Sequence, residues 1–130
     1  MIKDQVLEEK VFFVNRALLK QYADASGDQN PIHQDEAFAK SVGLPDVIAH
    51  GMLTMALVGK YVTEIAGGSA NVLELGGRFT KPVIVPADID VDITVSATVT
   101  DVEDGRASLS LVATSAGVKV LGMAKAVITL

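Results

Sequence analysis

The segment Gly51 to Ala66 constrains the fold of this chain more than any other stretch, because it is both long and strongly apolar. Its polar side chains form only a narrow stripe: Thr54, Lys60, Thr63 and Glu64. A helix that is apolar on most sides must be covered by the rest of the molecule. The sequence therefore predicts one mostly buried, central helix, which the following glycine pair ends.

Strand patterns fill the part of the chain that follows this helix. Apolar and polar residues alternate from Ala87 to Asp101, which is typical of a strand with one buried face. Turn sequences at Asp104-Gly105 and Ala116-Gly117 separate two further strands, Ala107 to Thr114 and Val118 to Thr129. This succession predicts an antiparallel meander.

Two more strand segments complete the sheet. Val72 to Thr80 is interrupted by Gly76-Gly77, where a bulge would curve the sheet, and Val11 to Val14 is typical of an edge strand. We therefore expect an α+β fold, a single domain over residues 1–130 in which a curved antiparallel sheet of about five strands wraps the long helix. Because such a sheet leaves an exposed edge, we also expect a dimer.

Two short helices are predicted between the first strand and the long helix. Asn15 is a suitable N-cap for a helix from Arg16 to Ala25, and Gly27 ends it. A second helix from Gln34 to about Ser41 has acidic residues in its first turn. This places His33 at its N-terminus. The residues expected to face inward are Ala37 and Phe38.

The loop between these helices holds two groups that can exchange protons. Asp28 and His33 lie five residues apart across Pro31, in a segment that we expect to be neither helix nor strand. General acid/base residues are often held on ordered loops of this kind. Turn and capping roles are equally ordinary for such residues, so the spacing alone leaves both interpretations open.

Motifs across most of the chain resemble the MaoC-like family of (R)-specific enoyl-thioester hydratases and 3-hydroxyacyl-thioester dehydratases, in particular its short, actinobacterial B-subunit type. The segments that carry the resemblance are Tyr22 to His33, Ala49-His50-Gly51-Met52-Leu53, Arg78 to Val83 and the glycine-containing C-terminal strand. The resemblance implies the hot-dog fold. It also implies a hydro-lyase of fatty-acyl metabolism that reversibly dehydrates (R)-3-hydroxyacyl thioesters to trans-2-enoyl thioesters.

The resemblance also assigns roles at the site. Asp28 and His33 would act on the one water that is added or lost, and the backbone N–H of Gly51 would hold the thioester oxygen. Gly51 opens the long helix, where unpaired N–H groups and the helix dipole favour negative charge.

Five further residues are expected at or near the substrate. Asn30 would fix the loop through its side chain, and His50 would either touch substrate or be buried against backbone. Gly59 stands where some hydratases carry a supporting Ser, and we expect it to leave room for an acyl chain. Arg78 and Lys81 would meet the anionic carrier, although two solvated charges at a strand end are an equal alternative.

Composition excludes several other classes of function. The net charge is −5 and no basic run is present, which argues against nucleic acid and anionic membranes as partners. Cysteine is absent, and the spacing of Asp28, His33, Asp46 and His50 matches no familiar metal site, so we expect neither metal nor cofactor. Without an apolar run of membrane-spanning length or a signal peptide, a cytoplasmic protein is expected.

The expected substrate is an acyl-CoA or acyl carrier protein thioester. A homodimer is expected, with a heterodimer of related subunits as the alternative. Two rival functions remain: a thioesterase on the same fold, and a non-catalytic acyl-binding subunit that completes a partner's tunnel. The presence of both Asp28 and His33 weighs against each of them.

Overall fold

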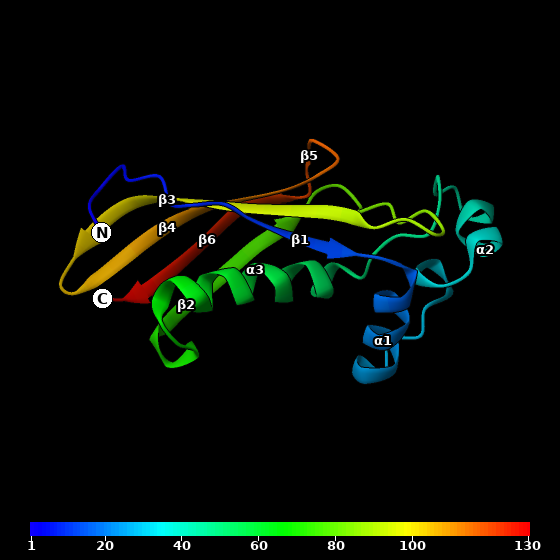
Figure 1. The fold of residues 1–130 in the computed structure, drawn as a ribbon, viewed down its shortest axis with the longest axis horizontal. Coiled ribbons are helices and arrows are strands. Elements are labelled where there is room, and N and C mark those ends of the chain that lie inside the picture. Colours follow the sequence, from blue (N-terminus) through cyan, green and yellow to red (C-terminus); the bar gives the residue numbers. More distant parts are fainter.

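One antiparallel sheet with a long helix lying along it makes up most of the molecule (Figure 1). The computed structural model describes all residues, 1–130. Its elements in chain order are β1 (Lys10–Val14), α1 (Arg16–Ser26), η1 (Pro31–His33), α2 (Glu36–Ser41), α3 (Gly51–Ala66), η2 (Ser69–Asn71), β2 (Val72–Phe79), β3 (Val91–Glu103), β4 (Arg106–Ser115), β5 (Val118–Lys119) and β6 (Leu121–Thr129).

The sheet has the strand order β1-β3-β4-β6-β2, and the two-residue β5 pairs with β4. The predicted α+β plan is confirmed, with β1 and β2 at the two edges. The register of β2 against β6 shifts between Gly76 and Arg78, at the predicted bulge. The predicted strand that begins at Ala87 starts too early, because Ile89 is half exposed and β3 begins only at Val91.

Alternation along β3 and β4 produces the core. The side chains of Ile93, Val95, Ala97 and Val99 are buried, and so are Ala107, Leu109, Leu111 and Ala113 on the neighbouring strand. Burying one Val, Leu or Ile side chain stabilises the folded state by about 1.5–3 kcal/mol relative to leaving it exposed to water. The period of two in the sequence therefore fixes which face of the sheet packs against α3.

The two predicted hairpin turns are confirmed. Asp104 and Gly105 have φ of 52° and 73°, and Ala116 and Gly117 have φ of 51° and 75°. Consecutive left-handed residues are typical of the two-residue turns whose twist matches that of paired strands. The strand after the second turn is broken, however, because the chain leaves β5 at Val120 before β6 begins.

Helix α3 has the predicted bounds and is mostly buried or half-buried, with one exposed stripe formed by Met52, Ala56, Lys60 and Glu64. The predicted polar stripe is wrong at Thr54, which is buried. Leu53, Val58 and Val62 are buried, whereas Met52 is 58% exposed and Ala56 is exposed. The helix lies along one face of the sheet and its far side remains open (Figure 1). None of the helices has both the length and the apolar character needed to span a bilayer.

Helices α1 and α2 lie together at one end of the elongated molecule (Figure 1). Asn15 caps α1 by accepting a 2.8 Å hydrogen bond from the Leu18 N–H, as predicted. The prediction for α2 was wrong in its facing residues, because Ala37 and Phe38 are exposed and Ala39 is buried. A separate 3-10 turn, η1, contains His33, and α2 begins at Glu36 with Asp35 as its N-cap, two residues later than predicted.

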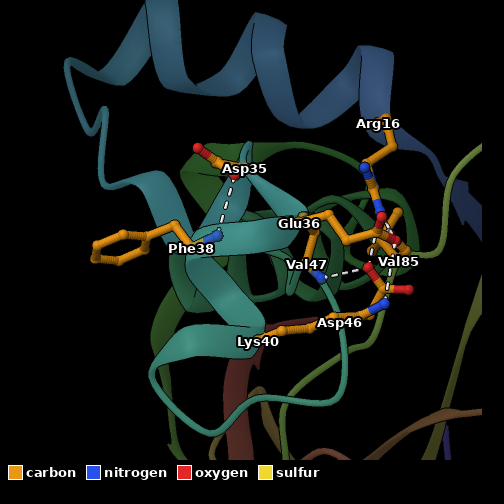
Figure 2. A network of polar contacts seen from close by, with 8 residues as sticks. All are labelled: Arg16, Asp35, Glu36, Phe38, Lys40, Asp46, Val47 and Val85. Atoms are coloured by element: carbon orange, nitrogen blue, oxygen red, sulfur yellow. Dashed lines mark hydrogen bonds and ion pairs between the residues drawn. The ribbon is translucent and has the colours of Figure 1, made fainter.

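A polar network joins these two helices to the segment that enters α3 (Figure 2). The Arg16 guanidinium donates to the Val85 carbonyl at 2.6 Å and to the Asp46 carboxylate at 2.8 Å. Asp46 also accepts from the Val47 N–H at 2.7 Å, and this bond, with the charge of Arg16, lowers the pKa of its carboxyl. Glu36 lies 3.6 Å from Arg16. The network fixes the approach of the chain to the residues of the site.

Candidate active site

The loop that carries Asp28 and His33 is held by bonds within itself. Gly27 takes the left-handed conformation, with φ of 81°, and so ends α1 immediately before Asp28. The Asp28 carboxylate accepts from the Asn30 N–H at 3.2 Å, and the Asn30 side chain accepts from the Ile32 N–H at 3.2 Å. The Asn30 side chain thus caps η1 and fixes the loop. The expectation that this segment is neither helix nor strand is wrong for the short turn η1.

His33 is buried at the end of η1, with one ring nitrogen occupied. Its Nδ1 lies 2.7 Å from the Ile48 carbonyl oxygen. A carbonyl only accepts hydrogen bonds, so Nδ1 carries the proton when the ring is neutral. Nε2 then keeps a free lone pair, as a general base requires.

His50 lies directly against this imidazole. The two rings are stacked, with centroids 3.8 Å apart and planes inclined by 24°. The Nε2 of His50 lies 3.1 Å from the backbone oxygen of Asp28, and the Tyr22 ring makes an edge contact at 4.7 Å. The Nδ1 atom of His50 is buried without a hydrogen-bond partner, and burial lowers the pKa of this imidazole.

The fold brings the acid and both imidazoles together. Asp28, His33 and His50 each place one atom able to bind a metal within 4.8 Å of the other two. Asp46, the fourth residue considered from sequence, instead pairs with Arg16. The three converging groups form a donor set that divalent transition metals accept, and the absence of a metal remains a prediction.

A pocket of about 330 Å³ opens beside these groups, within the size range of small-ligand sites. Three of the predicted site residues line it: His33, Gly51 and Lys81. The other lining residues are Ile48, Ala49, Thr54, Phe79, Thr80, Pro82, Val83 and Val120. A larger hollow of about 680 Å³ near the β3–β4 turn is lined mainly by charged and polar residues and contains no histidine, so we place the site at the smaller pocket.

Gly51 presents its N–H at the start of α3. This group donates to no backbone carbonyl. The first hydrogen bonds of the helix run from the N–H groups of Leu53 and Thr54 to the His50 carbonyl. A Cβ at Gly51 would lie 3.2 Å from the Phe79 ring, so a side chain here would crowd the pocket wall. The position combines an unpaired donor with close access to the backbone.

The sequence pattern of the MaoC like domain matches residues 1–119. This chain belongs to the MaoC-like family. Over its full length, this MaoC-like chain superposes on a solved MaoC-like dehydratase with a TM-score of 0.97 and 32% identity, and it covers 41% of that chain. An (R)-hydratase from A. caviae involved in PHA biosynthesis superposes with a TM-score of 0.85 and 25% identity, over 100% of this chain and 97% of that one.

Among the curated relatives is 3-hydroxyacyl-thioester dehydratase X of Mycobacterium tuberculosis. It is 40% identical over 77 residues, which are 59% of this chain and 26% of that protein. The MaoC-like chain therefore spans about a quarter of the length of this relative.

Not every residue predicted for the site of this MaoC-like chain lines the pocket. Arg78 is exposed on β2 and Gly59 lies two turns into α3, and neither is among the lining residues. The exposed loop residues Asp28 and Asn30 and the buried His50 are also absent from the lining. Sequence reasoning missed Thr54 and Phe79, which do line it. Thr54 follows Gly51 by about one helical turn, so the two residues lie on the same face of α3. That spacing could have indicated Thr54 as a residue of the site. Phe79 lies within the segment Arg78 to Val83 that carries the family resemblance, but it was given no role.

Gly59 packs toward the sheet. A Cβ at this position would lie 3.3 Å from Cδ2 of Leu75 on β2. We predict that Gly59→Ser hurts long-chain substrates selectively if the space here receives an acyl chain. Helix propensity by itself would stabilise the variant by a few tenths of a kcal/mol, roughly. Comparing kcat/KM for four-carbon and longer enoyl thioesters checks this, and an equal change for both lengths would leave Gly59 as helix–sheet packing alone.

Proposed function

We propose that this MaoC-like chain catalyses the reversible addition of water to trans-2-enoyl thioesters, giving (R)-3-hydroxyacyl thioesters. The observation that carries the proposal is the convergence of Asp28 and His33 beside a pocket that the unpaired N–H of Gly51 borders. The names of the similar proteins, a 3-hydroxyacyl-thioester dehydratase and an (R)-hydratase, support the same reaction class.

The dyad would take one proton from the water and deliver one proton to C2. In hydration, the water oxygen bonds to C3 as one of its protons passes to the dyad. A proton from the dyad is delivered to C2, and the second proton of the water remains on the new hydroxyl group. The free Nε2 of His33 suits proton acceptance, and the Asp28 carboxylate holds the water or receives its proton. Dehydration follows the same path in reverse.

Addition at C3 drives electrons toward the thioester, whose oxygen becomes enolate-like. Gly51 would stabilise that oxygen, because its N–H is unpaired and α3 directs its positive end to the same point. A donor fixed in advance stabilises charge that develops only in the transition state.

The thioester carrier would enter past Lys81. Lys81 lines the pocket and is exposed, so its ammonium can meet a phosphate of CoA or of an acyl carrier protein. Arg78 lies three residues earlier and is also exposed. Elsewhere the chain is acidic, with a net charge of −5, so these cations would orient the anionic carrier.

Product analysis tests the reaction. Incubation with crotonyl-CoA and longer trans-2-enoyl-CoAs should remove the enoyl absorbance and release no free thiol. Chiral chromatography should identify the (R)-3-hydroxy product. Release of thiol would instead indicate the thioesterase alternative, and an (S) product would contradict the proposal.

We also expect assembly into a two-fold dimer. The edge strand β2 exposes Leu73 and Phe79, and the open side of α3 exposes Met52. Apolar residues gathered on an edge and an adjoining helix favour an interface, typically of about 1,200–2,000 Å². Sedimentation equilibrium at micromolar concentration checks this. A monomer would contradict it, and dependence of activity on a co-expressed second subunit would favour a heterodimer.

A further inference from the structure

We propose that His50 is a positioning residue, whose neutral and buried imidazole holds Asp28 and His33 in their mutual arrangement. The inference rests on the proposed function and extends it beyond the groups that would meet substrate. His50 is 2% exposed and is not among the residues that line the pocket. Asp28 is also absent from the lining but is exposed, and His33 is buried but lines the pocket, so His50 alone of the three is both buried and outside the lining. Its surroundings therefore support a role other than direct substrate contact.

His50 contacts both members of the dyad and helix α1. Its Nε2–H donates to the Asp28 carbonyl at 3.1 Å, and its ring is stacked on His33 at 3.8 Å. Tyr22, on α1, meets the ring edge-on at 4.7 Å. In the chain, His50 is bonded directly to Gly51. One side chain thus connects both members of the dyad with the start of α3.

The hydrogen bonds require opposite tautomers in the two histidines. His33 carries its proton on Nδ1, because Nδ1 faces the Ile48 carbonyl, whereas His50 carries its proton on Nε2. The titratable groups that face His50 are His33, Asp28 and Tyr22. A proton on the buried Nδ1 of His50 would put a positive charge against His33. Keeping His50 neutral leaves His33 free to take up the proton during turnover.

The unpartnered Nδ1 indicates that His50 is not selected for stability alone. A buried acceptor without a partner lowers stability relative to an apolar group of the same shape. Phenylalanine would keep the ring stack and the edge contact without this cost. Loss of the Nε2–H donor would remove the 3.1 Å hydrogen bond to the Asp28 carbonyl.

Two variants separate positioning from stability. His50→Phe should keep the thermal midpoint of wild type and lower kcat by about tenfold to hundredfold, with KM unchanged, because misplacement of about 1 Å has effects of this size. His50→Gln, whose amide nitrogen can replace the Nε2–H donor, should recover part of kcat. Val58→Ala is the control, since Val58 is fully buried in α3 away from the dyad, and it should lower the midpoint without lowering kcat at 25 °C.

NMR spectra of the two histidine rings test the positioning role of His50 without any measurement of activity. The chain has only two histidines, so long-range ¹H–¹⁵N spectra resolve both rings and report their tautomers. We expect an Nδ1–H signal set for His33 and an Nε2–H set for His50 at neutral pH. The His33 signals should shift in His50→Phe and stay in place in Val58→Ala.

Several outcomes would overturn the proposal. Full kcat in His50→Phe would do so, as would a kcat loss that merely follows the loss of folded protein or a His50 ring that is protonated at neutral pH. If wild type hydrates no enoyl thioester, the proposed function fails, and the spectra alone then decide the positioning role. Unchanged His33 signals in His50→Phe would in that case reject it.

Discussion

Asp28→Asn and His33→Ala are each expected to lower the rate of trans-2-enoyl thioester hydration by roughly 10³-fold or more, since one positioned acid or base contributes about 10²–10⁴-fold. Both groups would act on the same water, so either loss should disable the other group. The double variant should therefore be nearly as active as each single variant, because groups that act as a unit are strongly non-additive. Steady-state loss of enoyl absorbance measures all three rates.

The fold should survive these changes. Asp28 is exposed, and its side chain makes one bond, at 3.2 Å, to the loop N–H of Asn30. Asp24→Asn is the matched control, because it removes another exposed carboxylate near the end of α1 and should leave the rate unchanged. A double variant whose losses multiply would contradict the shared water, and a collapse of the circular dichroism signal would make the rates uninformative about chemistry.

Gly51→Pro is expected to lower kcat by about 10²–10³-fold, the usual cost of removing one oxyanion donor. Proline is well suited to the first position of a helix, where its missing N–H breaks no intrahelical bond. His50 already has φ of −59° and ψ of 132°, an extended geometry that a following proline tolerates. The substitution therefore removes the proposed donor with little disturbance of the backbone.

Gly51→Ala is the matched control. Its Cβ would meet the same Phe79 ring, at 3.2 Å, but the N–H is retained. The ratio of kcat between the alanine and proline variants therefore measures the effect of losing the Gly51 N–H, separately from the effect of adding a Cβ beside Phe79. Equal rates in the two variants would show that the Gly51 N–H does not hold the thioester oxygen.

Local sequence was sufficient for some of the helices, turns and strands, but it missed the start of β3, the break between β5 and β6 and the turn η1. The bounds of α3, the cap of α1 and both hairpin turns followed from residue types within one turn of each feature. The cap depends on Asn15 and the first turn on Asp104-Gly105, which favour the required backbone angles wherever they occur. The second turn depends mainly on Gly117, because Ala116 has no preference for its φ of 51°. Alternation along β3 similarly predicted the buried face of the sheet.

Errors arose where a neighbour distant in sequence decided exposure. Phe38 is apolar but exposed, since Ala39 is the buried residue of α2. Met52 is exposed because the sheet covers only one side of α3. An apolar side chain gains free energy when it is buried, but the residue type does not show which surface, if any, will cover it.

For the site, the sequence by itself determined the loop that presents Asp28 and His33 and the glycine that opens α3. Only the tertiary structure decided that His50 stacks on His33, that Thr54 and Phe79 line the pocket, and that Gly59 meets Leu75. The reason is the range of the forces involved. Turns and caps are set by bonds between residues close in the chain, whereas ring stacking and pocket walls depend on how α3 lies against the loop and the sheet.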